Sequence, residues 1–168
     1  MTPTLPSSKF GELKTTFNFA KASVLMIDSN TTCLEVLSQI LSGFGFRKFD
    51  RHTSLNGVED IVRSCSLDLI LLDPYGLKQN AFDFVRWVRS ESLGTNSACP
   101  VMMVTAHTEM RNISPAKECG ADFVIAKPFA PIVLLERILW VAKGEGRGGF
   151  MAAPQALMSP GGSGVELW

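Results

Sequence analysis

Residues 68–73 read Asp-Leu-Ile-Leu-Leu-Asp, so four consecutive apolar residues end on the carboxylate of Asp73. A run this short that is apolar on both faces is typical of a strand buried between two layers of helices in a parallel sheet. Three other runs have the same form and also end on one polar residue: Val24–Ile27 before Asp28, Val101–Val104 before Thr105, and Phe123–Ala126 before Lys127. The pattern predicts an α/β fold built on one parallel sheet.

The polar residues that end these runs indicate a shared site. In a parallel sheet the carboxyl ends of the strands lie along one edge, where ligands bind. We therefore expect one crevice to be lined by two carboxylates, a hydroxyl and an ammonium, those of Asp28, Asp73, Thr105 and Lys127. These groups suit a divalent cation and a phosphoryl group. Each residue alone also has a structural interpretation as a helix cap or a turn residue.

Helical periodicity and turn residues separate the apolar runs. Thr32 and Glu35 have the spacing of a capping box at the start of the first helix. Pro115 predicts that the fourth helix is kinked or begins only at Ser114, because an interior proline costs about 3 kcal/mol. The expected helices are 31–42, 55–64, 81–90, 108–119 and 131–143, and the expected strands are 23–27, 46–49 at the sheet edge, 67–72, 100–104 and 123–126.

Composition bounds the class of protein. The chain has 168 residues, 46% of them hydrophobic and 19% charged, which suits one globular domain. The 16 basic and 16 acidic residues cancel, which argues against nucleic acid or an anionic membrane as a partner. Four cysteines without a C-x-x-C pair, and only two histidines, argue against a zinc site. Without a signal peptide or an apolar run of membrane-spanning length, the chain is expected to be soluble and cytoplasmic.

The distribution of glycine, proline and apolar residues predicts three segments. We expect an N-terminal extension at residues 1–21, one folded domain at 22–143, and a flexible tail rich in glycine and proline at 144–168.

From about Ala22 to Lys143 the chain resembles the receiver domain of two-component response regulators. The pieces that carry the resemblance have the order and spacing of that family: VLMID at 24–28, DLILLD at 68–73, CPVMMVTA at 99–106, CGADFVIAKPF at 119–129 and LLERIL at 134–139. The resemblance implies a five-stranded, doubly wound sheet with the flavodoxin-like strand order 2-1-3-4-5.

The resemblance also implies a role for each site residue. Asp73 matches the aspartate that accepts a phosphoryl group, and Thr105 and Lys127 match residues that contact the phosphoryl oxygens. Asp28, Asp73 and the backbone carbonyl of Tyr75 match the ligands of Mg²⁺. The expected function is that of a single-domain response regulator in a phosphorelay, with only self-phosphorylation and self-dephosphorylation chemistry rather than enzyme activity.

The expected partners follow from this function. The phosphoryl donor would be a histidine kinase or a histidine phosphotransfer protein, and the output would be contact with a downstream protein. The face formed by residues 108–119, 123–126 and 131–143 would be available for a homodimer. Neither nucleic acid nor a membrane is expected as a partner.

Several positions depart from the family pattern. Ser29 stands where the family has a second acidic residue, which should weaken Mg²⁺ binding, and Val124 stands where an aromatic switch residue is common. These changes favour an alternative, a degenerate pseudo-receiver that binds its partner without phosphorylation. Two more distant alternatives are a phosphatase of the haloacid-dehalogenase type, from the segment 28–32, and an FMN-binding flavodoxin.

Overall fold

The computed structural model describes residues 19–90, 92–142 and 165–166, and the description below concerns these residues. The strands are β1 (Ser23–Ile27), β2 (Lys48–His52), β3 (Leu69–Leu72), β4 (Val101–Thr105), β5 (Phe123–Ala126) and β6 (Val165–Glu166). The helices are α2 (Thr31–Phe44), α3 (Val58–Ser64), α4 (Ala81–Ser90), α5 (Met110–Cys119) and α6 (Pro131–Ala142), with 3-10 turns η1 (Phe19–Lys21) and η2 (Gly94–Ala98).

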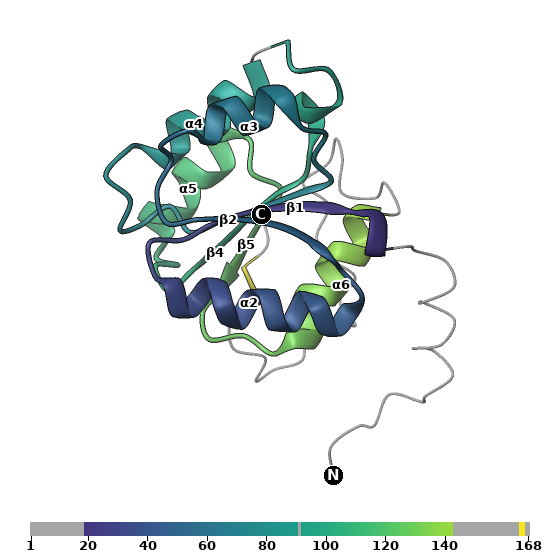
Figure 1. Ribbon diagram of the computed structural model, residues 1–168. Helices are drawn as coiled ribbons and strands as arrows, with labels where there is room; N and C mark the ends of the chain where they lie inside the picture. The colour runs from purple at the N-terminus through teal and green to yellow at the C-terminus, as the bar shows by residue number, and fades with distance from the viewer. Residues whose placement is uncertain (1–18, 91, 143–164, 167–168) are drawn as a thin grey trace.

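One sheet lies between two layers of helices, with α3, α4 and α5 on one face and α2 and α6 on the other (Figure 1). Its first five strands are parallel and have the order β2-β1-β3-β4-β5, which confirms the predicted flavodoxin-like fold class. The sheet also has a short sixth strand, because β6 pairs antiparallel with the outer edge of β5. This strand was not predicted, and it lies in the segment expected to be a flexible tail. The remainder of that tail and residues 1–18 of the extension lie outside the described residues.

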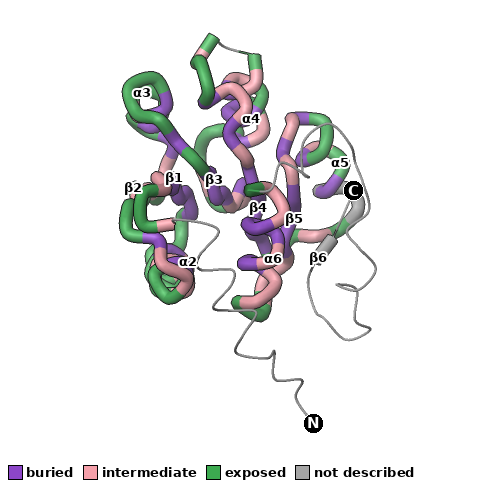
Figure 2. Tube along the Cα trace, turned by 90° about the vertical axis from the view of Figure 1, so that its right-hand side faces the viewer, coloured by how far each residue is buried: buried purple, intermediate pink, exposed green. Residues whose placement is uncertain are grey.

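The central strands are buried on both faces, as the continuous apolar runs predict. All four residues of β3 are buried, and alternate residues face opposite helix layers: Ile70 and Leu72 pack towards α3 and α4, whereas Leu69 and Leu71 pack towards α2 and α6. Figure 2 shows the buried segments gathered along these strands, with exposed segments in the outer helices and loops. Burying one such aliphatic side chain contributes about 1.5–3 kcal/mol, so each of these strand residues stabilises the fold.

The first helix begins at Thr31 as predicted, but its capping residue differs from the expected one. Its cap is Asn30, whose side chain accepts hydrogen bonds from the backbone N–H groups of Thr32 (2.9 Å) and Cys33 (3.3 Å). The expected capping box of Thr32 and Glu35 is therefore wrong, because both residues already lie inside α2.

The edge strand begins two residues later than expected. Phe46 N–H donates to the Leu41 carbonyl, and the ring of Phe46 is 2% exposed, so this residue closes the end of α2 instead of entering the strand. Gly45, with φ of 109°, makes the left-handed turn between them. α3 also begins late, at Val58, because residues 55–57 form a turn that ends at Gly57 with φ of 75°.

Pro115 lies inside α5 rather than in its first turn. The helix begins at Met110, so the prediction of a start at Ser114 is wrong. A proline at this position cannot donate to the carbonyl four residues earlier. The carboxyl-terminal turn nevertheless packs Ala116 and Cys119 into the core and ends at Gly120, and this packing holds the helix together.

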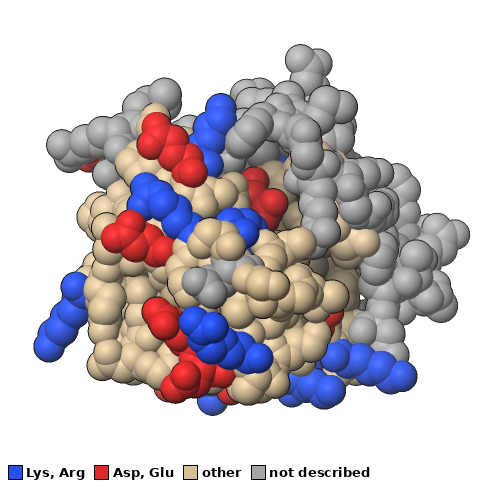
Figure 3. All heavy atoms as spheres, turned by 90° about the horizontal axis from the view of Figure 1, so that it is seen from above, with Lys and Arg blue, Asp and Glu red and all other residues tan. Residues whose placement is uncertain are grey.

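The surface over α3 and α4 carries charges of both signs. Seen from this side, Lys and Arg side chains are interspersed with Asp and Glu side chains (Figure 3). One exposed ion pair, between Arg86 and Asp83 at 2.6 Å, lies along α4. Within the described ranges, no helix has the length and apolar character needed to cross a membrane.

Candidate functional site

Three strand ends bring charged side chains together at the carboxyl edge of the sheet. Asp28, Asp73 and Lys127 directly follow β1, β3 and β5. The ammonium nitrogen of Lys127 lies 2.5 Å from Oδ2 of Asp28 and 3.0 Å from Oδ2 of Asp73. The side chain of Lys127 therefore bridges two carboxylates that are far from it in the sequence.

The site is shielded from solvent but not closed. The side chains of Asp28, Asp73 and Lys127 are 5%, 12% and 18% exposed. Burial lowers the pKa of Lys127, but the hydrogen bonds that its ammonium donates to Asp28 and Asp73, together with the charges of these carboxylates, outweigh burial, so the pKa lies above its ordinary value. The ammonium therefore stays charged at neutral pH, and two carboxylates share one cation.

Backbone N–H groups fix the orientation of both carboxylates. Oδ1 of Asp28 accepts from the N–H of Asn30 at 2.8 Å, and Oδ1 of Asp73 accepts from the N–H of Tyr75 at 3.0 Å. Each carboxylate thus uses one oxygen for the following loop and the other for Lys127. This repeated turn geometry is common for Asp at the start of a loop, and it aims both side chains at the same point.

Thr105 ends the strand between those of Asp73 and Lys127. Its side-chain oxygen accepts from the N–H of His107 at 3.1 Å, and the residue is 2% exposed. Because the Thr105 oxygen accepts this hydrogen bond, the proton of its hydroxyl remains available for donation to a phosphoryl oxygen.

Two rings meet beside the site. The rings of Tyr75 and His107 lie 4.6 Å apart, tilted by 48°, and Tyr75 also contacts the ring of Phe82 edge-on at 6.3 Å. The contact between Tyr75 and His107 was not predicted. A sequence signal exists, however, because each of these residues stands two positions after a strand-end residue of the site.

The loops that follow β1 and β3 touch each other. A Cβ atom placed on Gly76 would lie 2.4 Å from Oγ of Ser29, and the φ of Gly76 is 83°. Only glycine fits this position, both for its backbone conformation and for the space beside Ser29. The hydroxyl of Ser29 is thereby held against the loop that carries Tyr75.

The donor set fits Mg²⁺ only with help from water or a phosphoryl group. No cluster of three or more His, Cys, Asp or Glu side chains is placed to hold a metal in the part of the chain that the structure describes. Mg²⁺ is commonly bound by one or two carboxylates, with water and phosphate oxygens completing its octahedron. Asp28 and Asp73, the Tyr75 carbonyl and the Ser29 hydroxyl are compatible with that kind of site.

The family model of the response regulator receiver domain matches residues 24–139. The chain belongs to this family. As a class, receiver domains are signalling domains and generally bind Mg²⁺.

Curated relatives agree with this assignment. The DNA-binding response regulator MtrA of Mycobacterium tuberculosis is 32% identical over 117 residues, which is 68% of this chain and 48% of MtrA. The transcriptional regulatory protein GltR of Pseudomonas aeruginosa is 32% identical over 121 residues, 69% of this chain and 47% of GltR. This chain thus spans about half the length of the curated relatives that it matches.

Solved structures show the same fold. The CheY-like receiver domain protein of Methanospirillum hungatei has a TM-score of 0.65 at 21% identity, covering 76% of this chain and 98% of that one. The chemotaxis response regulator CheY4 of Vibrio cholerae has a TM-score of 0.63 at 25% identity, covering 71% of this chain and 98% of CheY4.

The relatives correct one prediction. Balanced net charge argued against nucleic acid as a partner, yet the MtrA relatives are named as DNA-binding response regulators. The prediction of partners without nucleic acid is therefore wrong. The net charge of this chain bears only on this chain, whereas the matched region is less than half of each DNA-binding relative.

Proposed function

We propose that this receiver domain accepts a phosphoryl group on Asp73 from a phosphohistidine of a histidine kinase or histidine phosphotransfer protein. The observation that carries the proposal is the position of Lys127, whose ammonium contacts both Asp73 and Asp28. A cation held beside a strand-end carboxylate is what a nucleophile needs when its attack brings further negative charge into the site.

In the proposed transfer, an oxygen of Asp73 attacks phosphorus and the bond between phosphorus and the donor nitrogen breaks. The electron pair of that bond leaves with the imidazole, and an acyl phosphate forms on Asp73. Lys127 pairs with one phosphoryl oxygen, and the hydroxyl of Thr105 donates to another. The backbone N–H of Tyr75 continues to orient the carboxyl group of Asp73 during the attack.

We assign Asp28, Asp73 and the backbone carbonyl of Tyr75 as the protein groups that would hold Mg²⁺. When bound, the metal neutralises charge on the phosphoryl oxygens. Ser29 supplies a hydroxyl in place of a carboxylate, so the protein contributes one negative charge fewer than the family pattern and binds the cation more weakly.

An apolar groove beside Lys127 gives the phosphoryl donor a place to dock. A cavity of about 230 Å³ lies between the exposed side of α2 and the loop after β5, bordered by Val36, Ile40, Pro128 and Phe129. Val36 is 50% exposed and is the large hydrophobic side chain most open to solvent among the described residues. An apolar helix surface of a donor protein would bury it next to the site.

The names of the relatives indicate that the output of signalling involves DNA. Because MtrA is named as a DNA-binding response regulator and GltR as a transcriptional regulatory protein, we infer that the phosphorylated receiver acts by contact with a DNA-binding unit. The charge added at Asp73 would bias that contact.

Acetyl phosphate tests the proposal directly. The protein is incubated with acetyl phosphate and excess Mg²⁺, and its intact mass is measured. We expect a gain of one phosphoryl group that Asp73→Asn abolishes. Asp68→Asn is the matched control, because Asp68 lies just before the same strand at its opposite end and should not affect the gain. An unchanged mass at saturating Mg²⁺ would refute phosphorylation at Asp73.

The second candidate is a pseudo-receiver that binds its partner without phosphorylation. Ser29 favours it by removing a carboxylate, and so does Val124, which is 2% exposed and has no ring to rotate towards Thr105. In that case Asp73→Asn would leave partner binding unchanged, whereas Asp73 phosphorylation predicts that binding responds to acetyl phosphate only in the wild-type chain.

A further inference from the structure

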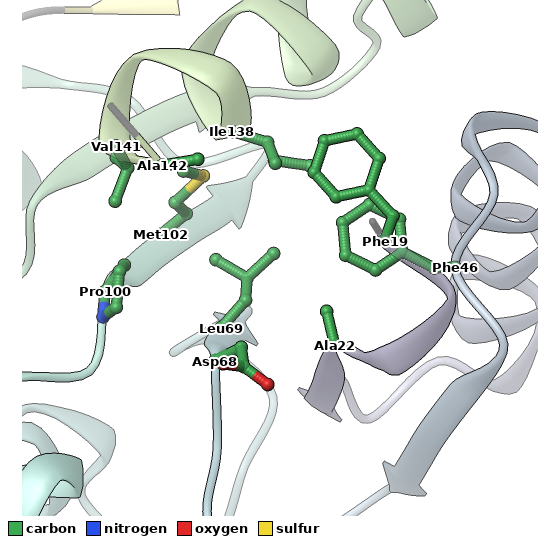
Figure 4. Close-up of a pocket in the computed structure, with 10 residues that line it drawn as sticks. All are labelled: Phe19, Ala22, Phe46, Asp68, Leu69, Pro100, Met102, Ile138, Val141 and Ala142. Carbon is green, nitrogen blue, oxygen red and sulfur yellow. The ribbon is translucent and has the colours of Figure 1, made fainter. Parts of the chain in front are cut away.

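An apolar pocket lies at the amino end of the sheet, the end opposite Asp73. Its volume is about 300 Å³, at the lower end of the range of about 300–1,000 Å³ for ligand cavities. Figure 4 shows its walls, which come from η1, the segments before β1 and β4, the first residue of β3 and the end of α6. Met102 and Ile138 project into it from the sheet and the helix.

Two aromatic rings form one wall, and a carboxylate lies at the rim. The rings of Phe19 and Phe46 stack at 4.5 Å. Asp68 is exposed and uses Oδ2 to accept from the N–H of Ser23 at 2.8 Å. The pocket is therefore suited to an apolar, preferably aromatic, side chain with a positive charge nearby.

The two ends of the described domain both reach this pocket. Phe19, the first described residue, and Ala142, the last residue of α6, both line it. Whatever precedes Phe19 or follows Ala142 must leave from the pocket's border. Chain geometry therefore makes these flanking segments the nearest candidates to fill it.

The two flanking segments differ in how many residues separate the described domain from their first large apolar side chain. Phe17 is two residues from Phe19, so the two Cα atoms are at most about 7 Å apart. After Ala142 the chain reads Lys-Gly-Glu-Gly-Arg-Gly-Gly, and its first large apolar residue is Phe150. The aromatic side chain closest in covalent terms therefore belongs to the N-terminal segment.

Charge favours the same segment. Residues 1–18 carry Lys9 and Lys14 against a single acidic residue, Glu12, so the segment is basic, whereas the rim of the pocket carries Asp68. Lys14 is three residues before Phe17 and can approach this carboxylate when the ring is inserted.

We propose that residues 14–18 dock at the amino end of the sheet, with the ring of Phe17 in this pocket. In an extended chain, residues two apart project to the same side, so Phe17 would enter beside Phe19. The docked segment would fasten the N-terminal extension to α6, at the far end of the domain from the phosphoryl site.

Nuclear Overhauser effects in the full-length chain test the proposal. We expect contacts between the ring protons of Phe17 and the methyl groups of Met102 and Ile138. Phe17→Ala should abolish them and lower the melting temperature by about 4 °C. Phe10→Ala is the matched control, because its ring is nine residues from Phe19 and should leave both the methyl shifts and the melting temperature unchanged.

A pocket-filling variant separates docking in the pocket from docking nearby. Ala142→Leu keeps a good helix former at the end of α6 and fills the pocket from its own wall. We expect the contacts of Phe17 to be lost while the rest of the domain spectrum is retained. Contacts from Phe150, contacts only between molecules in a mixed-label sample, contacts of Phe17 that persist in Ala142→Leu, or no contacts at all would each overturn the proposal.

Discussion

Asp28 and Lys127 form the shorter ion pair of the site, at 2.5 Å, although they lie 99 residues apart in the sequence. The Asp73 oxygen lies farther from the same ammonium, at 3.0 Å. Lys127 thus pairs with Asp28, a proposed metal ligand, and also with Asp73, the proposed acceptor of the phosphoryl group. The positions of all three depend on strands that lie side by side only in the folded chain.

Removing the ammonium group of Lys127 should destabilise the domain in a pH-dependent way. Because Asp28 and Asp73 raise the pKa of Lys127 above 10.5, the ammonium contributes stability that is fully present below that pH. This stability is lost as pH rises through the higher pKa of the folded state. We expect Lys127→Met to lower the free energy of unfolding by about 2 kcal/mol at neutral pH.

Urea unfolding of both proteins, from neutral pH to above 10.5, checks this sign. The difference between wild type and Lys127→Met should shrink at the alkaline end. Lys78→Met is the control, because Lys78 is exposed and should give no such pH-dependent difference. A difference that grows with pH would contradict the ion-pair explanation.

Restoring a carboxylate after β1 should strengthen metal binding. Ser29→Asp adds a negative charge next to Asp28, at the loop that touches Gly76. We expect the affinity for Mg²⁺ to rise by about tenfold, the lower end of effects seen when groups around a metal are changed. Isothermal titration with Mg²⁺ measures it.

Ser29→Asn separates charge from size in the same titration. Asn has the shape of Asp without its charge, so this variant should bind Mg²⁺ as the wild type does. Equal gains in both variants would show that the position acts through shape and not through its negative charge.

The sequence was sufficient to predict the sheet and the residues at its carboxyl edge. The runs that end at Asp28, Asp73 and Lys127 are short and apolar on both faces, which is typical of buried parallel strands, and such strands share an edge. β1, α4 and β5 have the predicted bounds for the same reason, since strong apolar patterns meet clear breaks there.

Features that depend on tertiary contacts were not predictable. Phe46 has the character of a strand residue, but it packs against Phe19 and closes α2. Pro115 alone argues for a kinked helix or for a late helix start, yet the helix begins at Met110, and Ala116 and Cys119 after the proline are buried in the core. The pairing of β6 with β5 joins segments forty residues apart, and a two-residue strand leaves no periodic pattern.

Asn96 is a structural residue that no local pattern marked. It is 4% exposed, and its side chain accepts from the N–H of Leu67 at 2.9 Å and donates to the carbonyls of Val62 at 2.8 Å and Cys65 at 2.6 Å. It therefore joins η2 to the end of α3 and to the segment that follows it before β3. Three backbone groups depend on one amide.

Asn96→Ala should lower the free energy of unfolding by about 2–4 kcal/mol, because it leaves these backbone groups without their partner. Urea denaturation measures the change. Asn56→Ala, at an exposed position bonded to Gln79, should cost less than about 1 kcal/mol. Similar losses in both variants would show that burial of the amide is not what matters.

We expect the buried guanidinium of Arg137 to make the domain less stable than an apolar side chain at the same position would. Arg137 is 2% exposed on α6, and among the described residues its Nε and Nη1 have no hydrogen-bond partner. Burial lowers the pKa of the guanidinium, opposed by Glu136, and the ring of Phe123 at 5.5 Å offers a cation–π contact. Such a contact contributes about 2 kcal/mol, less than the several kcal/mol that desolvation of a charge costs.

We therefore expect Arg137→Met to raise the free energy of unfolding by about 1–3 kcal/mol, because methionine keeps the apolar stem without the charge. Urea denaturation with an unchanged slope measures it, since the same slope indicates the same surface exposed on unfolding. Arg86→Met, in the exposed pair with Asp83, should change stability by less than about 0.5 kcal/mol. A loss of stability in Arg137→Met would mean that the guanidinium has a counter-charge beyond the described residues, and charge-neutral Arg137→Gln would then lose as much.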